Sequence, residues 1–281
     1  MSHHILEIED LGLDFDEKAG KQVVLNHLNL VQKKGEWLAL IGPHGAGKTS
    51  LGLVIKGLLT PTRGSLHMFS RCPEDDLQQR KQKVGLLFSN PRDQICALTV
   101  QGDIAFGLFQ LGLTKKESKK RVDEAMHILG ISHLAHQMTH SISGGEQQKV
   151  ALAGLVALKP EYIVLDEPAT FLSSRGRDEL LHLIKSLHDN GMSILYIAST
   201  WEEISKADRV AVLQEGRISW SASPHCLARE ERILEATGHC PPDIMRLVKK
   251  LRECGLDLPD HIQNADQLLD ILLRRFQGEK N

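Results

Sequence analysis

A glycine-rich segment near the amino end carries residue types that bind phosphate. It reads Gly42-Pro43-His44-Gly45-Ala46-Gly47-Lys48-Thr49-Ser50 and matches the spacing G-x-x-x-x-G-K-[ST] at every fixed position. Its glycines let successive backbone N–H groups converge on phosphate oxygens at the positive end of a helix. We expect Lys48 to hold the β- and γ-phosphates and the Thr49 hydroxyl to bind Mg²⁺. A simple strand-to-helix turn would not need the lysine, so this phosphate cradle, residues 42–50, predicts nucleotide binding.

A second candidate is an apolar run that ends in two carboxylates, Tyr162-Ile163-Val164-Leu165-Asp166-Glu167. Asp166, at the end of a buried strand, suits a ligand of Mg²⁺. Glu167 follows at once and is placed to orient or deprotonate an attacking water. Alone, such a run is more often a strand that meets solvent. Together with the cradle it predicts an ATPase site.

The third candidate is Ser143-Gly144-Gly145-Glu146-Gln147, which precedes Asp166 and begins a predicted helix. A serine and two glycines there make an anion site, and the plain alternative is a good N-cap. The three segments, in this order and spacing, resemble the ATP-binding subunits of ABC transporters over about residues 4–235. That resemblance implies ATP and Mg²⁺ as ligands. It also implies an α/β P-loop NTPase fold with a RecA-like parallel-sheet core, an antiparallel β subdomain, an inserted helical subdomain and a small C-terminal helical domain.

Other stretches resemble one branch of that family, the energy-coupling factor (ECF) ATPases that drive vitamin and cobalt or nickel uptake. They are Ser89-Asn90-Pro91-Arg92-Asp93-Gln94, Asp103-Ile104-Ala105-Phe106-Gly107 and the tail around Gly255-Leu256-Asp257-Leu258-Pro259. The branch implies that the tail helps the ATPases to dimerise and that Gln94 contributes to contacts with coupling helices. The predicted function is therefore an ATPase subunit that couples ATP hydrolysis to micronutrient uptake.

The resemblance also implies how such a subunit works and with whom. Two ATPase subunits sandwich two ATP molecules, and each site joins the cradle and residues 166–167 of one chain to residues 143–146 of the other. Phe15 stands where the family places an aromatic ring against adenine. The implied partners are a second ATPase subunit, expected to be a different chain, a helical transmembrane coupling subunit and, indirectly, a substrate-binding membrane subunit. The chain would then be cytoplasmic, on the inner face of the cell membrane through its partner.

Four positions depart from the family pattern. Ser89 stands where glutamine is usual, Ser173 where aspartate is usual, Ser199 where histidine is usual, and His44 where asparagine is commoner. A serine hydroxyl is too short to replace glutamine or histidine at a γ-phosphate, and one lost transition-state donor costs about 10²–10³ in rate. We therefore expect ATP binding with slow turnover in the chain's own site, while residues 143–146 remain able to complete a partner's site. Three alternatives stay open: an active homodimer with unusual switch residues, a non-hydrolysing structural subunit, and a soluble ABC ATPase without a transporter.

Alternating strands and helices must position these groups. We expect strands over residues 5–13, 23–31, 36–41, 83–88, 162–165, 193–198 and 209–213, with the charged stretch 14–22 as a turn. Helices are expected over residues 48–58, 146–158 and 175–190, and helical spacing without strands over residues 99–140. The predicted domains are residues 1–235, with a helical subdomain at about 95–160, and residues 236–281. Pro241-Pro242 marks the boundary, and Asn264 is placed to cap a last amphipathic helix.

Composition excludes several other classes. The 281 residues are 41% apolar, which excludes wholesale disorder, and 34 basic against 36 acidic residues argue against nucleic acid as the main partner. Five cysteines without a C-x-x-C pair indicate a reduced, cytosolic chain. No apolar run approaches the roughly 18 residues of a membrane span, and the amino end is too acidic for a signal peptide. His133, His136 and His140 have near-helical spacing, but no carboxylate joins them as in a metal site, and Trp201 is expected to serve packing.

Overall fold

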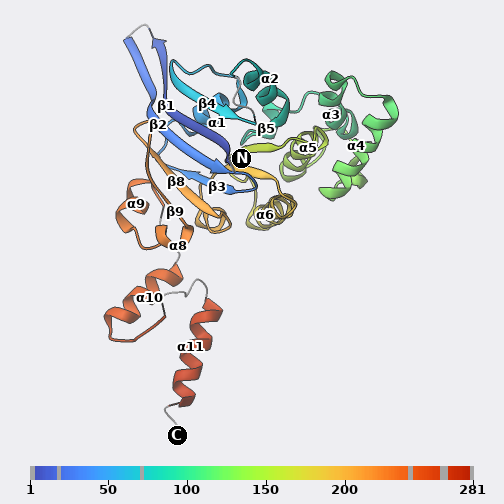
Figure 1. Cartoon of the computed structure of the whole chain (residues 1–281). Helices are drawn as coiled ribbons and strands as arrows, with labels where there is room; N and C mark the ends of the chain where they lie inside the picture. The colour runs from blue at the N-terminus through green and yellow to red at the C-terminus, as the bar shows by residue number, and fades with distance from the viewer. Residues whose placement is uncertain (1–3, 18–19, 70–72, 240–242, 260–264, 279–281) are drawn as a thin grey trace.

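The computed structural model describes residues 4–17, 20–69, 73–239, 243–259 and 265–278. A six-stranded sheet lies at its centre, in the order β5-β6-β7-β3-β8-β9 (Figure 1). Its strands are β3 (Trp37–Ile41), β5 (Val84–Leu87), β6 (Tyr162–Asp166), β7 (Ser193–Ile197), β8 (Arg209–Gln214) and β9 (Arg217–Ala222). Neighbouring strands are parallel except β9, which is antiparallel to β8. The expected parallel-sheet core is confirmed.

Each face of this sheet packs into its own apolar layer. In β3, Leu38 and Leu40 belong to one buried cluster, whereas Trp37, Ala39 and Ile41 belong to the other. This alternation explains why β3, β6 and β7 are buried along their whole length and almost wholly apolar, as strands covered on both faces must be. The first cluster includes α1 (Lys48–Lys56), and the second includes α6 (Ser174–Asp189).

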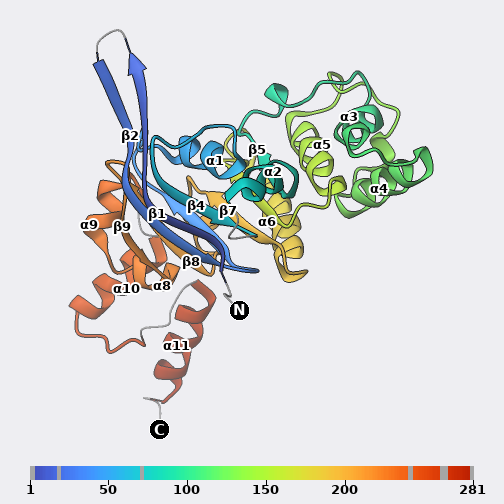
Figure 2. The same cartoon turned by 45° about the horizontal axis from the view of Figure 1, so that its top comes forward.

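A second, antiparallel sheet has the order β2-β1-β4 and covers the first of these layers. Its strands are β1 (His4–Glu17), β2 (Gly20–Lys33) and β4 (Arg63–Met68). The expectation of a turn over residues 14–22 is wrong, because Asp14 pairs with Val23 and Phe15 with Gln22. Here β1 and β2 extend beyond the body as a ribbon (Figure 2), and an exposed ribbon does not need the apolar alternation that marks a half-buried strand.

The inserted helical subdomain is confirmed as well. It contains α3 (Val100–Phe106), α4 (Lys115–Ile128) and α5 (Gly144–Ala157), which pack on one another at the side of the molecule away from the β1–β2 ribbon (Figure 1). Three elements had not been expected: β4, β9 and α2 (Pro73–Lys83). The helix α2 is almost wholly polar, so it shows no apolar periodicity in the sequence.

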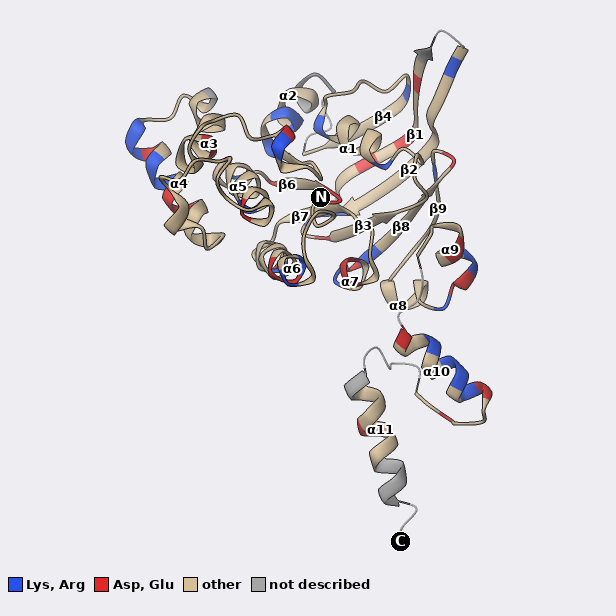
Figure 3. Ribbon diagram, turned by 180° about the vertical axis from the view of Figure 1, so that it is seen from behind, with Lys and Arg blue, Asp and Glu red and all other residues tan. Residues whose placement is uncertain are grey.

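Four helices follow the central sheet: α8 (Pro224–Leu227), α9 (Glu231–Ala236), α10 (Asp243–Glu253) and α11 (Ala265–Gly278). Leu227 and Leu234 join the main core, whereas α10 and α11 build a small core of their own around Val248, Leu258 and Leu268. Both project from the body, and α10 carries several basic residues (Figures 1 and 3). The predicted boundary Pro241-Pro242 and the predicted cap Asn264 lie outside the described residues. In the ranges that are described, no helix combines the length and the apolar character that crossing a membrane requires.

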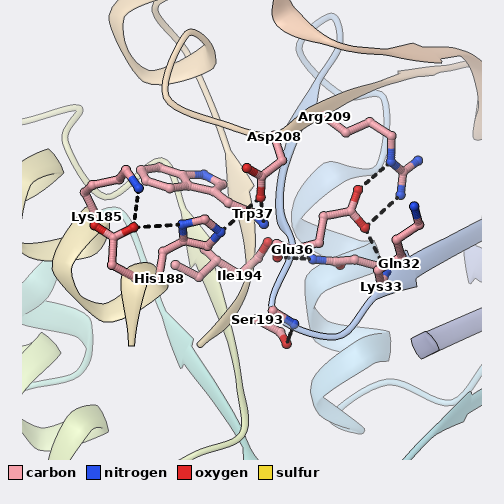
Figure 4. Close-up of polar contacts among 12 residues, drawn as sticks. Gln32, Lys33, Glu36, Trp37, Lys185, His188, Ser193, Ile194, Asp208 and Arg209 are labelled. Atoms are coloured by element: carbon pink, nitrogen blue, oxygen red, sulfur yellow. Dashed lines mark hydrogen bonds and ion pairs between the residues drawn. The ribbon is translucent and has the colours of Figure 1, made fainter. Parts of the chain in front are cut away.

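A buried polar cluster joins the two sheets (Figure 4). The side-chain amide of Gln32, on β2, donates to the carbonyl oxygens of Glu36 and Ile194, both at 2.9 Å. The Tyr162 hydroxyl donates to the same amide's oxygen at 2.5 Å. Nearby, the Arg209 guanidinium donates to the Glu36 carboxylate at 2.6 Å. One fully buried side chain of β2 thus satisfies groups from β6, from β7 and from the turn before β3, which holds the second sheet in place on the first.

Candidate functional site

The phosphate cradle connects β3 to α1, as expected. Ile41 ends β3, and α1 begins at Lys48 after Gly47, whose φ is 98°. A Cβ on Gly42 would lie 2.1 Å from the carbonyl oxygen of Leu213, and a Cβ on Gly47 would lie 2.9 Å from Leu25. Neither position can therefore hold a side chain, and both glycines are required for the loop to pass between β8 and β2.

The ammonium group of Lys48 lies inside the loop. It donates to the carbonyl oxygens of Gly42 at 2.8 Å and Pro43 at 3.0 Å. Burial lowers the pKa of Lys48, and the negative charges of Glu167 and Asp166 oppose this shift. Of the other cradle residues, His44, Gly45 and Thr49 are exposed, Pro43, Gly47 and Ser50 are half-buried, and Ala46 packs into the core. The site thus places the ammonium group of Lys48 beside the exposed backbone of the loop, as phosphate binding requires.

Thr49 and Asp166 meet across the site. Asp166 is the last residue of β6, pairs with Ile197 on β7 and is 7% exposed. Burial raises the pKa of its carboxyl group and the charge of Glu167 adds to this, while a hydrogen bond from Thr49 and the charge of Lys48 oppose it. A hydroxyl oxygen and a carboxylate oxygen in contact are the hard ligands that Mg²⁺ prefers. The predicted pair therefore fits this ion.

Glu167 is held beside Asp166 in a constrained conformation. Its φ is +46°, a region that residues other than glycine rarely adopt. The backbone N–H donates to Ile197 at 3.1 Å, and the Thr170 hydroxyl donates to the carboxylate at 3.3 Å. A carboxylate presented at the carboxyl ends of β6 and β7 is placed to accept a proton from a water beside the cradle.

Ser199 lies just beyond the end of β7. Its N–H donates to the carboxylate of Glu203 at 2.8 Å, and its hydroxyl lies 3.4 Å from the same oxygen. Glu203 is completely buried. Burial raises its pKa, and the hydrogen bonds from Ser199 and Thr200 and the charge of Arg177 oppose this shift. Ser199 is therefore tied to the first turn of α7 (Trp201–Ile204).

The other two unusual serines have different surroundings. The Ser173 hydroxyl accepts a hydrogen bond from the N–H of Gly176 at 3.2 Å and caps α6, a task that serine performs as well as aspartate. Ser89 lines a pocket together with Gly144 and Phe171. The side chain of Gln94 is bonded to the backbone of Phe88 and Leu86, both at 2.8 Å. Gln94 thus holds its own loop to the end of β5, and its expected contribution to contacts with coupling helices stays a prediction.

The segment 143–146 begins α5 with a capping box. The Ser143 hydroxyl accepts from the N–H of Glu146 at 3.3 Å, and the Glu146 carboxylate accepts from the N–H of Ser143 at 2.8 Å. The Ser143 hydroxyl also donates to that carboxylate at 2.7 Å, and this bond, together with the one from the Ser143 N–H, lowers the pKa of Glu146. All four residues of the segment line an open pocket shared with Ser173 and the start of α6, and none of the pocket's lining residues belongs to the cradle.

Phe15 lies on the β1–β2 ribbon near the cradle. It pairs with Gln22, two pairs beyond Leu13 and Leu25, and the Leu25 side chain is the one that packs against Gly47. The ring is 37% exposed. A partly exposed aromatic ring can stack on another flat ring, and the contact of Phe15 with adenine stays a prediction.

His239 is a residue beside the site that no motif indicated. It follows α9 and is 9% exposed, and its ring lies close enough to Lys48, Glu167 and the Ala198 carbonyl for each to shift its pKa. An isolated histidine after a short polar helix has no signal in the sequence. Only the folded chain brings it to this end of the sheet.

The structure also describes the surroundings of the three histidines and of Trp201 that the sequence had singled out. No group of three His, Cys, Asp or Glu side chains that could hold a metal ion occurs among the residues with described positions, so His133, His136 and His140 form no such site there. Trp201 is half-buried and packs against the main core, which confirms its expected role.

Comparison with known proteins agrees with this geometry. The family model described as ABC transporter matches residues 25–170. The chain is 35% identical to the energy-coupling factor transporter ATP-binding protein EcfA1 of Halalkalibacterium halodurans, over 95% of this chain and 96% of that protein. It is 34% identical to the cobalt import ATP-binding protein CbiO of Syntrophus aciditrophicus, over 94% of each.

Solved structures show the same fold. CbiO1 from Clostridium perfringens, described as part of the ABC transporter complex cbiONQ, superposes with a TM-score of 0.73 at 28% identity, covering 88% of this chain and all of that one. A dimeric bacterial ABC transporter cassette superposes with a TM-score of 0.70 at 23% identity, over 78% of this chain and 98% of that one.

Proposed function

Because the chain belongs to the ABC transporter family and, within it, to the energy-coupling factor ATP-binding proteins, we propose that it powers an importer of a micronutrient, a vitamin or cobalt or nickel, through a membrane partner. As a member of this family it is an ABC-type ATPase. The observation that carries the proposal is the meeting of Thr49 and Asp166 beside Lys48, in a chain that matches ECF subunits along nearly its whole length.

The chain's own residues divide the work at the nucleotide. The backbone of residues 42–50 and Lys48 bind the phosphates, and Phe15 stacks on the base. Thr49 and Asp166 hold Mg²⁺, which neutralises phosphate charge when it is bound. Glu167 orients the attacking water and accepts its proton.

A second ATPase subunit completes each site in this proposal. Residues 143–146 line a pocket apart from their own cradle, which supports their use by the facing chain. Leu247 on α10, and Leu269 and Leu273 on α11, are between 45% and 54% exposed. Exposed leucines on a small helical unit favour association. We infer that residues 236–281 form a dimerisation domain and that residues 1–235 form the ATPase domain.

The membrane partner would dock on the helical subdomain. Leu98, Phe106 and Phe109 are between 52% and 76% exposed within one short stretch of chain. Nearby, Ser89 and Pro91 share a pocket with residues of α5 and with Phe171, itself 71% exposed. Apolar side chains beside a pocket suit the short apolar helix of a transmembrane coupling subunit. Such docking would hold the chain on the cytoplasmic, inner face of the membrane and link it indirectly to a substrate-binding subunit.

The chain's own site is proposed to bind ATP but to turn it over slowly. Ser89 and Ser199 are too short to reach a γ-phosphate, and the Ser199 hydroxyl lies toward Glu203. Ser173 retains the cap of α6 but not the carboxylate. Slow turnover favours a heterodimer in which a different, active chain uses residues 143–146 of this one.

The test measures ATP affinity and ATPase activity of the purified chain with Mg²⁺, beside Ser199→His and Glu167→Gln. We expect tight ATP binding and turnover at the level of the Glu167→Gln control, partly restored by Ser199→His. Fast turnover by the unmodified chain that is abolished in the control would contradict slow turnover and indicate a self-sufficient homodimer. Failure to co-purify with a membrane subunit would contradict the transport role.

A further inference from the structure

The first two turns of α4 carry lysines that no carboxylate neutralises. They are Lys115, Lys116 and Lys119, and we call them the lysine face. All three are exposed, and none forms an ion pair with a described residue. The next two cations of the helix are paired, because the guanidinium of Arg121 donates to Glu117 at 3.0 Å and the ammonium of Lys120 lies 3.7 Å from Glu124. The free positive charge of α4 is therefore concentrated at its beginning.

The lysine face occupies one side of the helix. With about 100° between successive residues of an α-helix, its three members fall within an arc of roughly 100°, and the paired Arg121 and Glu117 lie on the opposite side. Asp123, one turn after Lys119, shares the lysine side but forms no ion pair with a described residue. Figure 3 shows the basic residues of α4 at the outer edge of the helical subdomain, away from the central sheet. The face is thus a positive patch open to solvent.

The position of these charges does not serve the stability of the helix. α4 begins after Thr114, whose hydroxyl accepts a hydrogen bond from the N–H of Glu117 at 3.2 Å. Lys115 and Lys116 therefore stand in the first turn, at the positive end of the helix dipole, where cations are unfavourable. Charges that oppose their own helix and have no partner in the described fold favour a partner outside it.

The lysine face lies close to the surface proposed for the membrane partner. Phe106 ends α3, and Phe109 lies in the 3-10 helix that follows, Gly107–Leu111. Their side chains are 52% and 76% exposed. The stretch of chain from Phe109 to Lys115 spans at most about 20 Å. A transmembrane subunit that docks on these rings would therefore bring the lipid headgroups near the beginning of α4.

We propose that the lysine face binds anionic lipid headgroups of the bilayer that holds the membrane partner. Each lysine is a flexible point charge, so the three together suit the mobile phosphates of a lipid surface. Near an anionic bilayer each of them contributes about fivefold in affinity. The inference rests on the proposed transport function and adds the lipid itself as a contact beside the protein partner. The contact holds the helical subdomain at the membrane surface.

The experiment measures binding of the purified full chain to vesicles by flotation. Vesicles of phosphatidylcholine alone are compared with vesicles that also contain the anionic phosphatidylglycerol. We expect binding to the anionic vesicles only, and weaker binding at high salt, because salt screens exposed charges. The variant that combines Lys115→Gln, Lys116→Gln and Lys119→Gln should bind at least about tenfold more weakly.

A matched control loses the same charge from three exposed lysines elsewhere in the chain. It combines Lys34→Gln, Lys206→Gln and Lys250→Gln. We expect it to bind within about twofold of the unmodified chain, because attraction to the bilayer falls off within a Debye length of the surface. Equal weakening in both variants would show that only net charge matters and would overturn the inference. Absence of binding by the unmodified chain to anionic vesicles would overturn it as well.

Two further measurements separate the other outcomes. If the lysine-face variant still binds vesicles but no longer co-purifies with a membrane subunit, the face contacts protein and the inference is wrong. An unmodified chain that co-purifies with no membrane subunit would instead overturn the proposed function. Thermal unfolding checks the fold: the lysine-face variant should keep or raise its midpoint, because it removes cations from the first turn of α4. A lowered midpoint would assign these lysines a structural role and contradict the inference.

Discussion

The backbone of Gly42 lies directly against Leu213, so that a Cβ on Gly42 would be 2.1 Å from the Leu213 carbonyl oxygen. The first residue of the cradle is therefore built into the contact between β3 and β8. Gly45, in the same loop, has φ +78° and nothing within 4 Å of an added Cβ.

This contrast predicts unequal costs for two alanine substitutions. Gly42→Ala must displace a backbone carbonyl in the core, and we expect it to cost 3 kcal/mol or more in the free energy of unfolding, at the upper end of about 0.5–3 for single substitutions. Gly45→Ala places alanine in a left-handed backbone conformation without a clash, and we expect it to lower the free energy of unfolding by only about 1–2 kcal/mol. Urea unfolding of both variants tests this, and equal costs would show that the contact with Leu213 relaxes freely.

Lys48→Met is expected to weaken ATP binding without a large change in the free energy of unfolding. The variant keeps an unbranched side chain, one atom shorter, but removes the cation, so we expect ATP affinity to fall at least about 100-fold, because charged hydrogen bonds contribute about 1.5–3 kcal/mol each. Burial already lowers the pKa of Lys48, so the folded chain gains little from the charge. The unfolding free energy should change by less than about 1 kcal/mol. Unchanged ATP affinity, measured by calorimetry, would remove Lys48 from the site.

Gln32→Leu tests the buried cluster that joins the two sheets. The substitution removes the bonds of Gln32 to the Ile194 carbonyl and the Tyr162 hydroxyl, whereas the Glu36 carbonyl keeps its bond from the N–H of Ile194. Since each buried unsatisfied group costs about 1–3 kcal/mol, we expect a loss of about 2 kcal/mol or more. Gln22→Leu, at an exposed position of the same strand, is the control and should stay within about 0.5 kcal/mol. A similar effect of both substitutions would contradict the role of the cluster.

The buried ring of His239 predicts a pH dependence of stability. Burial holds the pKa of His239 in the folded chain below its ordinary value of 6.5, so the unfolded chain binds more protons as the pH falls. Stability contributed at this residue is therefore present above pH 6.5 and is lost as the pH falls from there through the lower folded pKa. Urea unfolding at pH 7.5 and 5.5 should show a smaller decrease for His239→Gln than for the unmodified chain. An identical decrease would mean that the ring is not desolvated.

The sequence predicted those features that depend on neighbouring residues. The cradle, the apolar strands β3, β6 and β7 and the cap at Ser143 each follow from local spacing, and the structure contains all of them. The turn expected over residues 14–22 failed because a solvent-exposed ribbon needs no apolar alternation. The backbone partners that the Gln94 amide finds at the end of β5 were likewise not indicated by spacing alone.

What the sequence determined by itself is the loop that binds phosphate, because the φ angles and missing side chains of its glycines act over a few residues. What only the tertiary structure decided is which distant side chains surround that loop. Thr49 meets Asp166 because the sheet places β6 and β3 on either side of β7. His239 reaches the same edge because a glycine reverses the chain after α9, and no sequence spacing encodes that encounter.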